Sequence, residues 1–254
     1  FPRLRLGKRV AGSPLHGGDG CWAEYMLTSA MNVAPLPSGI SSEQGSMMLV
    51  NPMTAKAFIH LAREGKHRAM VNNAAASSLG KMLVRLTNKR GIPLINIVRK
   101  DEQADSLKAL GAVHVLNSNS TYFAAELEAL CEELGATLIL DAVTGRQSSI
   151  LLDAAPRGST LLAYARLSGD PLQADPGALI REEKEIVGFQ LGNWLSSKGL
   201  LFKIRFIASV KKALDNELFS QINRTYPLDQ AEEAIAFYKD HMSDGKIILK
   251  IGSV

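Results

Sequence analysis

A run of small residues between Val71 and Gly80, VNNAAASSLG, follows a short apolar segment and opens into a helical pattern. A strand, a tight turn and a helix N-terminus in this order bind the pyrophosphate of a dinucleotide, because backbone N–H groups and the helix dipole face its charge. Gly80 stands where the last glycine of such a turn packs helix against strand. Ser77 and Ser78 replace glycines, but they are small and carry hydroxyl donors. By itself, the turn is equally compatible with a structural role.

Two basic residues, Arg99 and Lys100, end the next apolar strand, and Arg99 lies nineteen positions beyond Gly80. An NAD site has Asp or Glu near this position to accept from the ribose 2′-OH, whereas a cation meets the 2′-phosphate of NADP. Together with the turn, the two cations predict an NADP site. The alternative is that both are merely solvated surface charges.

Alternating strands and helices must position these residues. Leu79, Met82, Leu83 and Leu86 follow the helical period, and apolar strands alternate with helices as far as Leu191. This pattern predicts an α/β fold with a doubly wound, Rossmann-type parallel sheet that helices cover on both faces. The tail from Phe219 reads strand, helix, strand. We expect it to pair with strand-like residues between Cys21 and Val33, which would form a second, mainly β domain from both chain ends.

Local signals predict where several helices begin and end. Ser41 with Gln44 three places later is a capping box. Asn51 followed by Pro52 predicts a cap and a first helical residue. Asp101 is the expected cap of the helix that follows Arg99 and Lys100, and Gly111 is expected just past its end.

The composition restricts the class of protein. The chain has 254 residues, 46% of them hydrophobic and 21% charged, which is ordinary for a globular protein without a membrane span. Its two cysteines, Cys21 and Cys131, exclude a disulfide framework, and scattered histidines without a CxxC or HExxH motif predict no metal site. We expect a reducing, cytoplasmic location. The net charge of +4 favours anionic ligands, while dispersed basic residues without interleaved aromatics argue against nucleic acid.

These segments together resemble the medium-chain dehydrogenase/reductase superfamily, in its zinc-free branch of quinone oxidoreductases and 2-enoyl thioester reductases. The segments that carry the resemblance are, in chain order, GCWAEYMLTSAMNVAPLP, VNPMTAKAF, VNNAAASSLG, NIVRKDEQADSLKALGAVHVLN, LDAVTG, GSTLLAYARLSG, IVGFQLGNWL and DGKIILKI. Within the branch, VNPMTA, the basic end of the second strand and GFQL followed by NW are most similar to the enoyl thioester reductases.

The resemblance implies a domain organisation. Residues 1–45 would be part of a GroES-like substrate domain, 46–216 the NADP-binding Rossmann domain, and 217–254 the return to the GroES-like domain. Members of the family have a longer N-terminal segment, so we expect that part of the GroES-like domain to be missing. In the enoyl reductases, the missing part supplies the tyrosine thought to donate the proton, and Tyr25 lies in the wrong segment to replace it. No catalytic residue is therefore assigned.

The resemblance also assigns cofactor-binding residues. Asn51 and Thr54 would lie at the nicotinamide end, and Arg99 and Lys100 would bind the 2′-phosphate. The others would be Ala76, Ser77, Ser78, Leu79 and Gly80 at the pyrophosphate, Tyr164 and Ala165 beside the ribose and nicotinamide, Phe189 and Leu191 in the nicotinamide pocket, and Lys246 from the tail.

Each assignment outside the turn has a structural alternative. Tyr164 and Phe189 are compatible with core packing, Asn51 with a helix cap, and Lys246 with a solvated strand end. Trp194 suits dimer or core packing better than substrate contact. Asp141, which ends an apolar strand, is a candidate general base or, more simply, a helix cap.

The predicted function is NADPH-dependent transfer of hydride to a small molecule, either a quinone or an α,β-unsaturated carbonyl or enoyl thioester. In the family, the sixth strand, here Ile186 to Leu191, pairs across a homodimer, which predicts the same for this chain. A non-catalytic, truncated NADP-binding form or scaffold is the alternative function. RNA binding, as in some quinone reductase relatives, is a third.

Overall fold

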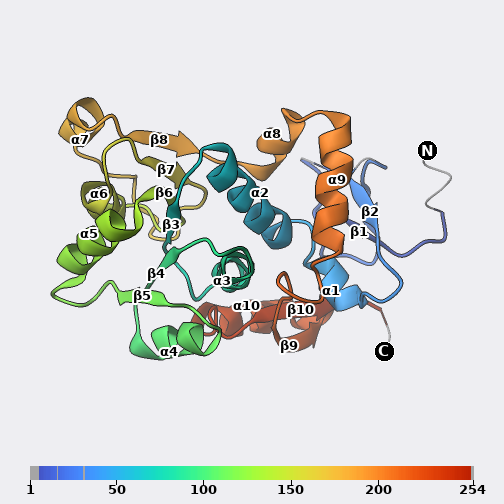
Figure 1. Cartoon of the computed structure of the whole chain (residues 1–254). Coiled ribbons are helices and arrows are strands. Elements are labelled where there is room, and N and C mark those ends of the chain that lie inside the picture. The colour runs from blue at the N-terminus through green and yellow to red at the C-terminus, as the bar shows by residue number, and fades with distance from the viewer. Residues whose placement is uncertain (1–5, 16, 31, 253–254) are drawn as a thin grey trace. The chain divides into compact units, whose positions relative to one another are not determined.

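The computed structural model describes residues 6–15, 17–30 and 32–252, and its contacts divide the chain into two compact units (Figure 1). Unit 1 comprises Phe1–Met53 and Arg205–Val254, and unit 2 comprises Thr54–Ile204. Helices α2 (Asn51–Glu64) and α9 (Leu200–Lys211) cross from one unit to the other. The assignment of these units to a substrate domain and a cofactor domain, with boundaries near 45 and 216, stays a prediction. Across the described ranges, no helix has the length and apolar character needed to cross a membrane.

Unit 2 is an α/β domain around one six-stranded sheet. The strand order is β5-β4-β3-β6-β7-β8, and every neighbouring pair is parallel, which confirms the doubly wound Rossmann-type fold. The strands are β3 (Ala69–Asn72), β4 (Leu94–Val98), β5 (His114–Asn117), β6 (Ala136–Asp141), β7 (Thr160–Ala163) and β8 (Glu185–Gly188). The helices are α3 (Ser78–Arg90), α4 (Asp101–Ala109), α5 (Phe123–Leu134), α6 (Arg146–Ala154), α7 (Pro176–Arg181) and α8 (Leu191–Ser196).

The strand residues of this sheet alternate between two covered faces. Ala69, Val71 and Ile139 pack with apolar residues of α5 and α6 in one core cluster. Figure 1 shows α5 and α6 on one side of the strands and α2 and α3 on the other. Both faces are therefore shielded from water, which explains the continuous apolar runs of these strands. The period predicted for α3 is confirmed, since Leu79, Met82, Leu83 and Leu86 are all buried.

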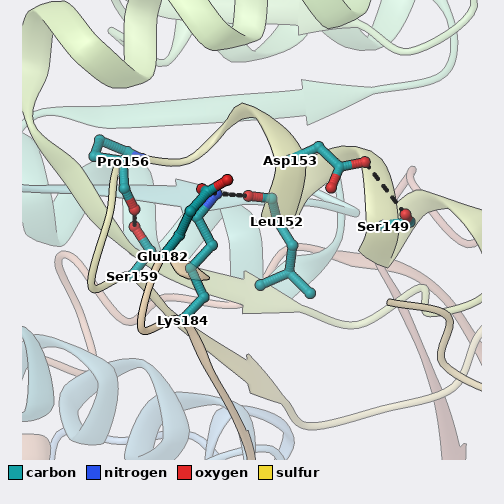
Figure 2. Close-up of polar contacts among 7 residues, drawn as sticks. All are labelled: Ser149, Leu152, Asp153, Pro156, Ser159, Glu182 and Lys184. Atoms are coloured by element: carbon teal, nitrogen blue, oxygen red, sulfur yellow. Dashed lines mark hydrogen bonds and ion pairs between the residues drawn. The ribbon is translucent and has the colours of Figure 1, made fainter. Parts of the chain in front are cut away.

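A buried lysine precedes the edge strand β8. The Lys184 side chain is fully buried, and its Nζ donates to the Leu152 carbonyl at 2.6 Å and pairs with Glu182 at 2.5 Å (Figure 2). The backbone N–H of Glu185, the first residue of β8, donates to the Ser159 carbonyl at 2.9 Å. An unpaired buried ammonium is costly, so the lysine must keep these partners. Its bonds tie the end of α6 to the start of β8.

Strand β8 ends earlier than the sequence predicts. The expected sixth strand, Ile186 to Leu191, was too long, because β8 stops at Gly188 and Leu191 is the first residue of α8. The reason is local capping: the Gln190 side chain accepts from the Asn193 N–H at 2.6 Å and starts a new helix. Phe189 and Leu191 therefore follow the strand rather than belong to it.

Unit 1 contains two separate two-stranded sheets among its described residues. β1 (Val10–Gly12) pairs antiparallel with β2 (Val33–Pro35), and β9 (Ile222–Pro227) pairs parallel with β10 (Lys246–Lys250) through α10 (Ala231–Asp240). The expectation that the tail strands pair with the N-terminal ones was thus wrong. The strand-like spacing from Cys21 likewise gives no strand before Val33: Cys21–Tyr25 are bends, and the described residues between them and Val33 have no ladder partner within the described part of the chain.

Side-chain bonds nevertheless join the two chain ends inside unit 1. The capping box before α1 (Ser42–Ser46) is half correct: the Gln44 N–H donates to Ser41 Oγ at 3.1 Å. The Gln44 amide does not reach back to Ser41 but donates to the Ser220 carbonyl at 2.7 Å. The Lys211 Nζ donates to the Pro35 carbonyl at 2.7 Å. Both ends of the chain therefore contribute to one compact unit.

Candidate functional site

The turn between β3 and α3 is shaped by one indispensable glycine. A Cβ at Gly80 would lie 2.1 Å from the Ala75 carbonyl oxygen, so helix and turn approach more closely than any side chain allows. Ser77 caps α3, because its Oγ accepts from the Gly80 N–H at 3.1 Å. Ala74 adopts a left-handed conformation, with φ of 48°, which usually favours glycine. The turn thus keeps the glycine-loop shape although alanine and serine occupy most of its positions.

The exposed part of this turn is formed by serines. Ala76 and Leu79 are buried, whereas Ser77 and Ser78 are half-buried. The first turn of α3 has no acidic side chain, so its N–H groups and dipole favour an anion. Of the residues predicted to cradle a pyrophosphate, Ser77 and Ser78 carry hydroxyls in the half-buried part of the turn, Ala76 and Leu79 are buried, and the Gly80 N–H is already bonded to Ser77 Oγ.

Arg99 and Lys100 follow the strand next to this turn. β3 and β4 are parallel, with Asn72 opposite Asn96, so both strands end at the same edge of the sheet. Both basic residues are exposed, and within the described ranges neither side chain has an ion pair or a hydrogen bond. Two uncompensated cations therefore flank the carboxyl edge of the sheet, where open α/β folds bind their ligands.

The loop that carries these cations is held by neighbouring side chains. The Arg99 N–H donates to Gln103 Oε1 at 3.1 Å, and the Arg99 carbonyl accepts from Asn119 Nδ2 at 2.9 Å. The prediction that Asp101 caps α4 was wrong: Lys100 is the cap residue, without a side-chain cap, and Asp101 is the first helical residue. Its carboxylate accepts from Asn117 Nδ2 at 2.8 Å instead. Gly111 does follow the end of α4, with φ of 94°.

Asp141, at the end of β6, is a buried structural acceptor. It has no exposed surface, and it accepts from Asn73 Nδ2 at 2.6 Å, from Ser148 Oγ at 2.5 Å and from the N–H groups of Val143 and Thr144, each at 2.9 Å. A carboxylate with four donors is fixed and shielded, which argues against the general-base alternative. It is not the cap residue of α6 either, since Gly145 occupies that position.

An aromatic cavity lies where β7 and β8 end. It is an open hollow of about 590 Å³, lined by residues that include Leu61, Tyr164, Val187, Phe189, Asn193 and Trp194. The ring of the fully buried Phe58, on α2, lies with its centroid 5.0 Å from those of both Tyr164 and Phe189. The structure thus brings two of the predicted nicotinamide-pocket residues together on one wall, and Trp194 packs at 6.2 Å from Phe189.

Burial controls the protonation of Tyr164. Desolvation, and secondarily the charge of Asp141, raise the pKa of its hydroxyl far above the ordinary value of 10.0. Tyr164 is therefore a neutral phenol at physiological pH. Ala165, which follows it, is exposed, and Leu191 is half-buried at the start of α8 and not part of the cavity wall.

The remaining predicted residues occupy the ends of other elements. Asn51 is the first residue of α2 rather than its cap, and Thr54 is buried one turn later. In unit 1, the Lys246 Nζ lies 3.4 Å from the Tyr238 hydroxyl and 5.6 Å from the centre of its ring. The cofactor contacts predicted for Asn51, Thr54 and Lys246 stay predictions.

Several contributors were missed from the sequence. Asn73 follows β3, Asn117 is the last residue of β5, and Asn119 lies in the loop after it. Their amides hold loops, and Phe58 packs behind the cavity from α2. Polar residues at or just after the ends of buried strands were the available signal for the asparagines. In the part of the chain that the structure describes, no three His, Cys, Asp or Glu side chains gather into a group able to hold a metal ion.

Comparisons with known proteins find similarity to dehydrogenases and reductases. The zinc-binding dehydrogenase family matches residues 78–204. The mitochondrial enoyl-[acyl-carrier-protein] reductase of Caenorhabditis elegans is 29% identical over 199 residues, which cover 75% of this chain and 55% of the relative. The human enzyme of that name is 27% identical over 187 residues, 71% of this chain and 50% of the relative. The chain thus spans about half the length of these curated relatives.

Solved structures match more of the chain. A crystal structure described as a putative NADPH:quinone reductase from Mesorhizobium loti superposes with a TM-score of 0.83 and 33% identity, covering 98% of this chain and 71% of the other. A variant of Etr1p in complex with NADP and crotonyl-CoA gives a TM-score of 0.73 at 21% identity, over 89% and 70% of the two chains. At that identity, the second likeness shows the fold.

Proposed function

The chain belongs to the zinc-free reductase branch of the medium-chain dehydrogenase/reductase superfamily, and we propose that it is an NADPH-dependent reductase. Its acceptor would be a quinone or the electron-poor C=C bond of an α,β-unsaturated carbonyl or enoyl thioester. Relatives named for enoyl reduction and for NADPH:quinone reduction support this choice of acceptors.

One observation carries the choice of cofactor: two cations without partners among the described residues, Arg99 and Lys100, follow the strand next to a turn where a Cβ on Gly80 would meet backbone. The residues present fit a dinucleotide with a 2′-phosphate. Ser77, Ser78 and the first turn of α3 would hold the pyrophosphate, and Arg99 with Lys100 the 2′-phosphate. An NAD site would have Asp or Glu at the position of Arg99 to accept from the ribose 2′-hydroxyl. A cation there cannot accept that hydrogen bond, which disfavours NADH.

When bound, NADPH supplies the hydride, and the protein supplies orientation and a shielded pocket. Tyr164 and Phe189 line the cavity with rings that pack on the buried Phe58, and they would shield the reacting carbon from water. For an enoyl substrate, hydride adds to the β-carbon and a proton adds to the α-carbon. For a quinone, hydride and a proton together give the hydroquinone. Asp141 does not deliver that proton, because four donors already surround it.

A fluorescence titration with NADPH and NADH tests the cofactor choice. We expect Arg99→Ala to weaken NADPH by about 1.5–3 kcal/mol, roughly ten- to a hundredfold, and to leave NADH unchanged. Lys108→Ala is the matched control, since it removes an equal charge from the exposed last turn of α4. If Arg99→Ala weakens NADPH binding no more than Lys108→Ala does, the 2′-phosphate is not bound at Arg99 and the NADPH assignment is wrong.

Turnover of crotonyl-CoA and of 1,4-benzoquinone, followed by the loss of NADPH absorbance, then tests the reaction. NADP binding without turnover is the second candidate function, because Asp141 is shielded by four donors and no other described residue is assigned to deliver the proton. Tight NADPH binding with neither substrate consumed would favour that second function.

We also propose a homodimer through β8 and a cytoplasmic location. β8 is the edge of the six-stranded sheet, and Val187 on it is 41% exposed, so a second copy could extend the sheet there. Light scattering of the chain and of Val187→Glu checks the first point: equal masses at the monomer value would refute it. Cell fractionation checks the second against the mitochondrial location that the relatives' names carry.

A further inference from the structure

We propose that Asn117 is a specificity-determining positioning residue, which keeps the carboxylate of Asp101 away from the phosphate site formed by Arg99 and Lys100. This inference rests on the proposed NADPH function. It adds a residue that contacts no part of the cofactor itself and acts only through its neighbours.

The position of Asn117 follows from the sheet. β5 is parallel to β4, and Asn117 lies opposite Val98, the residue before Arg99. The Ser118 N–H donates to the Val98 carbonyl at 2.8 Å and extends this pairing past the strand end. The loop after β5 is thereby held directly beside the loop that carries the two cations.

The amide of Asn117 is engaged at both ends. Its Nδ2 donates to Asp101 Oδ1 at 2.8 Å, and its Oδ1 accepts from the Asn119 N–H at 3.0 Å. Only one orientation of the amide satisfies a carboxylate acceptor and an N–H donor together, so the amide cannot flip without losing both bonds. The Asn119 side chain in turn donates to the Arg99 carbonyl. One chain of hydrogen bonds therefore fixes Asp101 and the backbone of Arg99.

The carboxylate of Asp101 matters because it lies close in sequence to the two cations. Asp101 is two residues after Arg99, in the exposed first turn of α4. A released carboxylate there would pair with a cation, repel a 2′-phosphate, or accept from a bare ribose hydroxyl. Each of these would reduce the preference for NADPH over NADH. In the described structure no ion pair joins Asp101 to Arg99 or Lys100, and the bond to Asn117 accounts for this.

The test compares dissociation constants for NADPH and NADH, and for the fragments 2′,5′-ADP and 5′-AMP, in matched variants. We expect Asn117→Ala to lower the preference for the 2′-phosphorylated ligand about three- to tenfold at low salt, from one charge meeting a dianion across water. Adding Asp101→Asn to Asn117→Ala should restore the preference, because the carboxylate is then absent. Asn216→Ala, at an exposed asparagine of unit 1, is the control for the substitution itself.

The double variant, Asn117→Ala with Asp101→Asn, distinguishes a role of Asn117 in positioning the carboxylate from a role in the stability of the loop. If Asn117→Ala only loosens the loop, removing the Asp101 charge will not restore the preference, and the inference is overturned. An unchanged preference in Asn117→Ala overturns it as well. Arg99→Ala, measured alongside, isolates the proposed function: if it leaves the preference intact, the NADPH assignment fails, and this inference fails with it. If Arg99→Ala abolishes the preference and Asn117→Ala does not alter it, only the inference on Asn117 is wrong.

Discussion

Replacing Gly80 by alanine tests whether the turn before α3 depends on close contact between helix and strand. The added Cβ would lie 2.1 Å from the Ala75 carbonyl oxygen and 2.6 Å from its carbon, whereas real Cβ contacts below 3.0 Å essentially never occur. Both atoms belong to the backbone, so no side chain can rotate away. The start of α3 must therefore move by roughly 1 Å, the difference between the 2.1 Å contact and the 3.0 Å limit, which also strains the Gly80 N–H bond to Ser77.

The magnitude follows from three contributions. Overpacking against a rigid neighbour costs about 1–3 kcal/mol, and loss of the Ser77 cap costs about 1 kcal/mol. Alanine regains about 1 kcal/mol of helix propensity over glycine. We therefore expect Gly80→Ala to reduce the free energy of unfolding by about 1–3 kcal/mol. The displaced N–H groups should also weaken NADPH binding, because the pyrophosphate needs their exact approach.

Urea unfolding followed by circular dichroism, with hydrogen exchange of the α3 amides, measures this effect. Gly199→Ala is the matched control, since a Cβ there meets nothing within 4 Å and its φ is not left-handed. We expect that control to stay within about 0.5 kcal/mol of the wild type. The reasoning is refuted if the two variants unfold alike and Gly80→Ala binds NADPH as tightly as the wild type does.

Two further predictions concern buried groups. Lys184→Ala removes one of the two donors to the Leu152 carbonyl, which keeps the Ala155 N–H at 3.2 Å, and empties the space of a buried side chain. It should cost about 1–3 kcal/mol, whereas the exposed Lys212→Ala should be neutral. The hydrogen bond and charge of Lys184 lower the pKa of Glu182, so the contribution of this pair exists above the unfolded pKa of about 4.5 and is lost as the pH falls through the lower folded value. The bond to Leu152 does not titrate there, so the gap in urea midpoints between wild type and Lys184→Ala should narrow in acid without closing, and a constant gap would contradict this. Burial raises the pKa of the Cys131 thiol to about 12, so iodoacetamide at about pH 8 should label only the exposed Cys21 in the native chain and both thiols in urea; double labelling of the native chain would contradict this.

The sequence predicted the elements whose signals are local. The burial of Leu79, Met82, Leu83 and Leu86 follows from the period of one helix, and the parallel sheet follows from alternating apolar strands. Gly80 was identified because a helix packing on its own preceding strand involves only neighbouring residues. These signals are contained in short windows, where backbone geometry leaves few alternatives.

The errors arose where distant partners decide the outcome. Residues from Cys21 have the spacing of a strand, but a strand exists only where another strand pairs with it, and the ladder begins at Val33. The tail strands β9 and β10 pair with each other in parallel, because α10 provides the crossover that such a pair requires. The length of β8 was misjudged for a local reason instead, since the Gln190 side chain caps α8 three residues before Asn193 and ends the extended run.

The same contrast applies to cofactor selectivity. Counting from Gly80 to Arg99 identifies a cation where the second ribose is expected, yet Asp101 follows two residues later, and by sequence alone an acid there is as good an acceptor for NAD. What distinguishes the two readings is the register of β4 against β5, which places Asn117 beside Val98 and within 2.8 Å of the Asp101 carboxylate. An acid counts against NADP only if its carboxylate is free to lie at the phosphate site. In this fold, a residue sixteen positions away decides whether it is, so selectivity belongs to the pair of loops rather than to the single residue that motif counting finds.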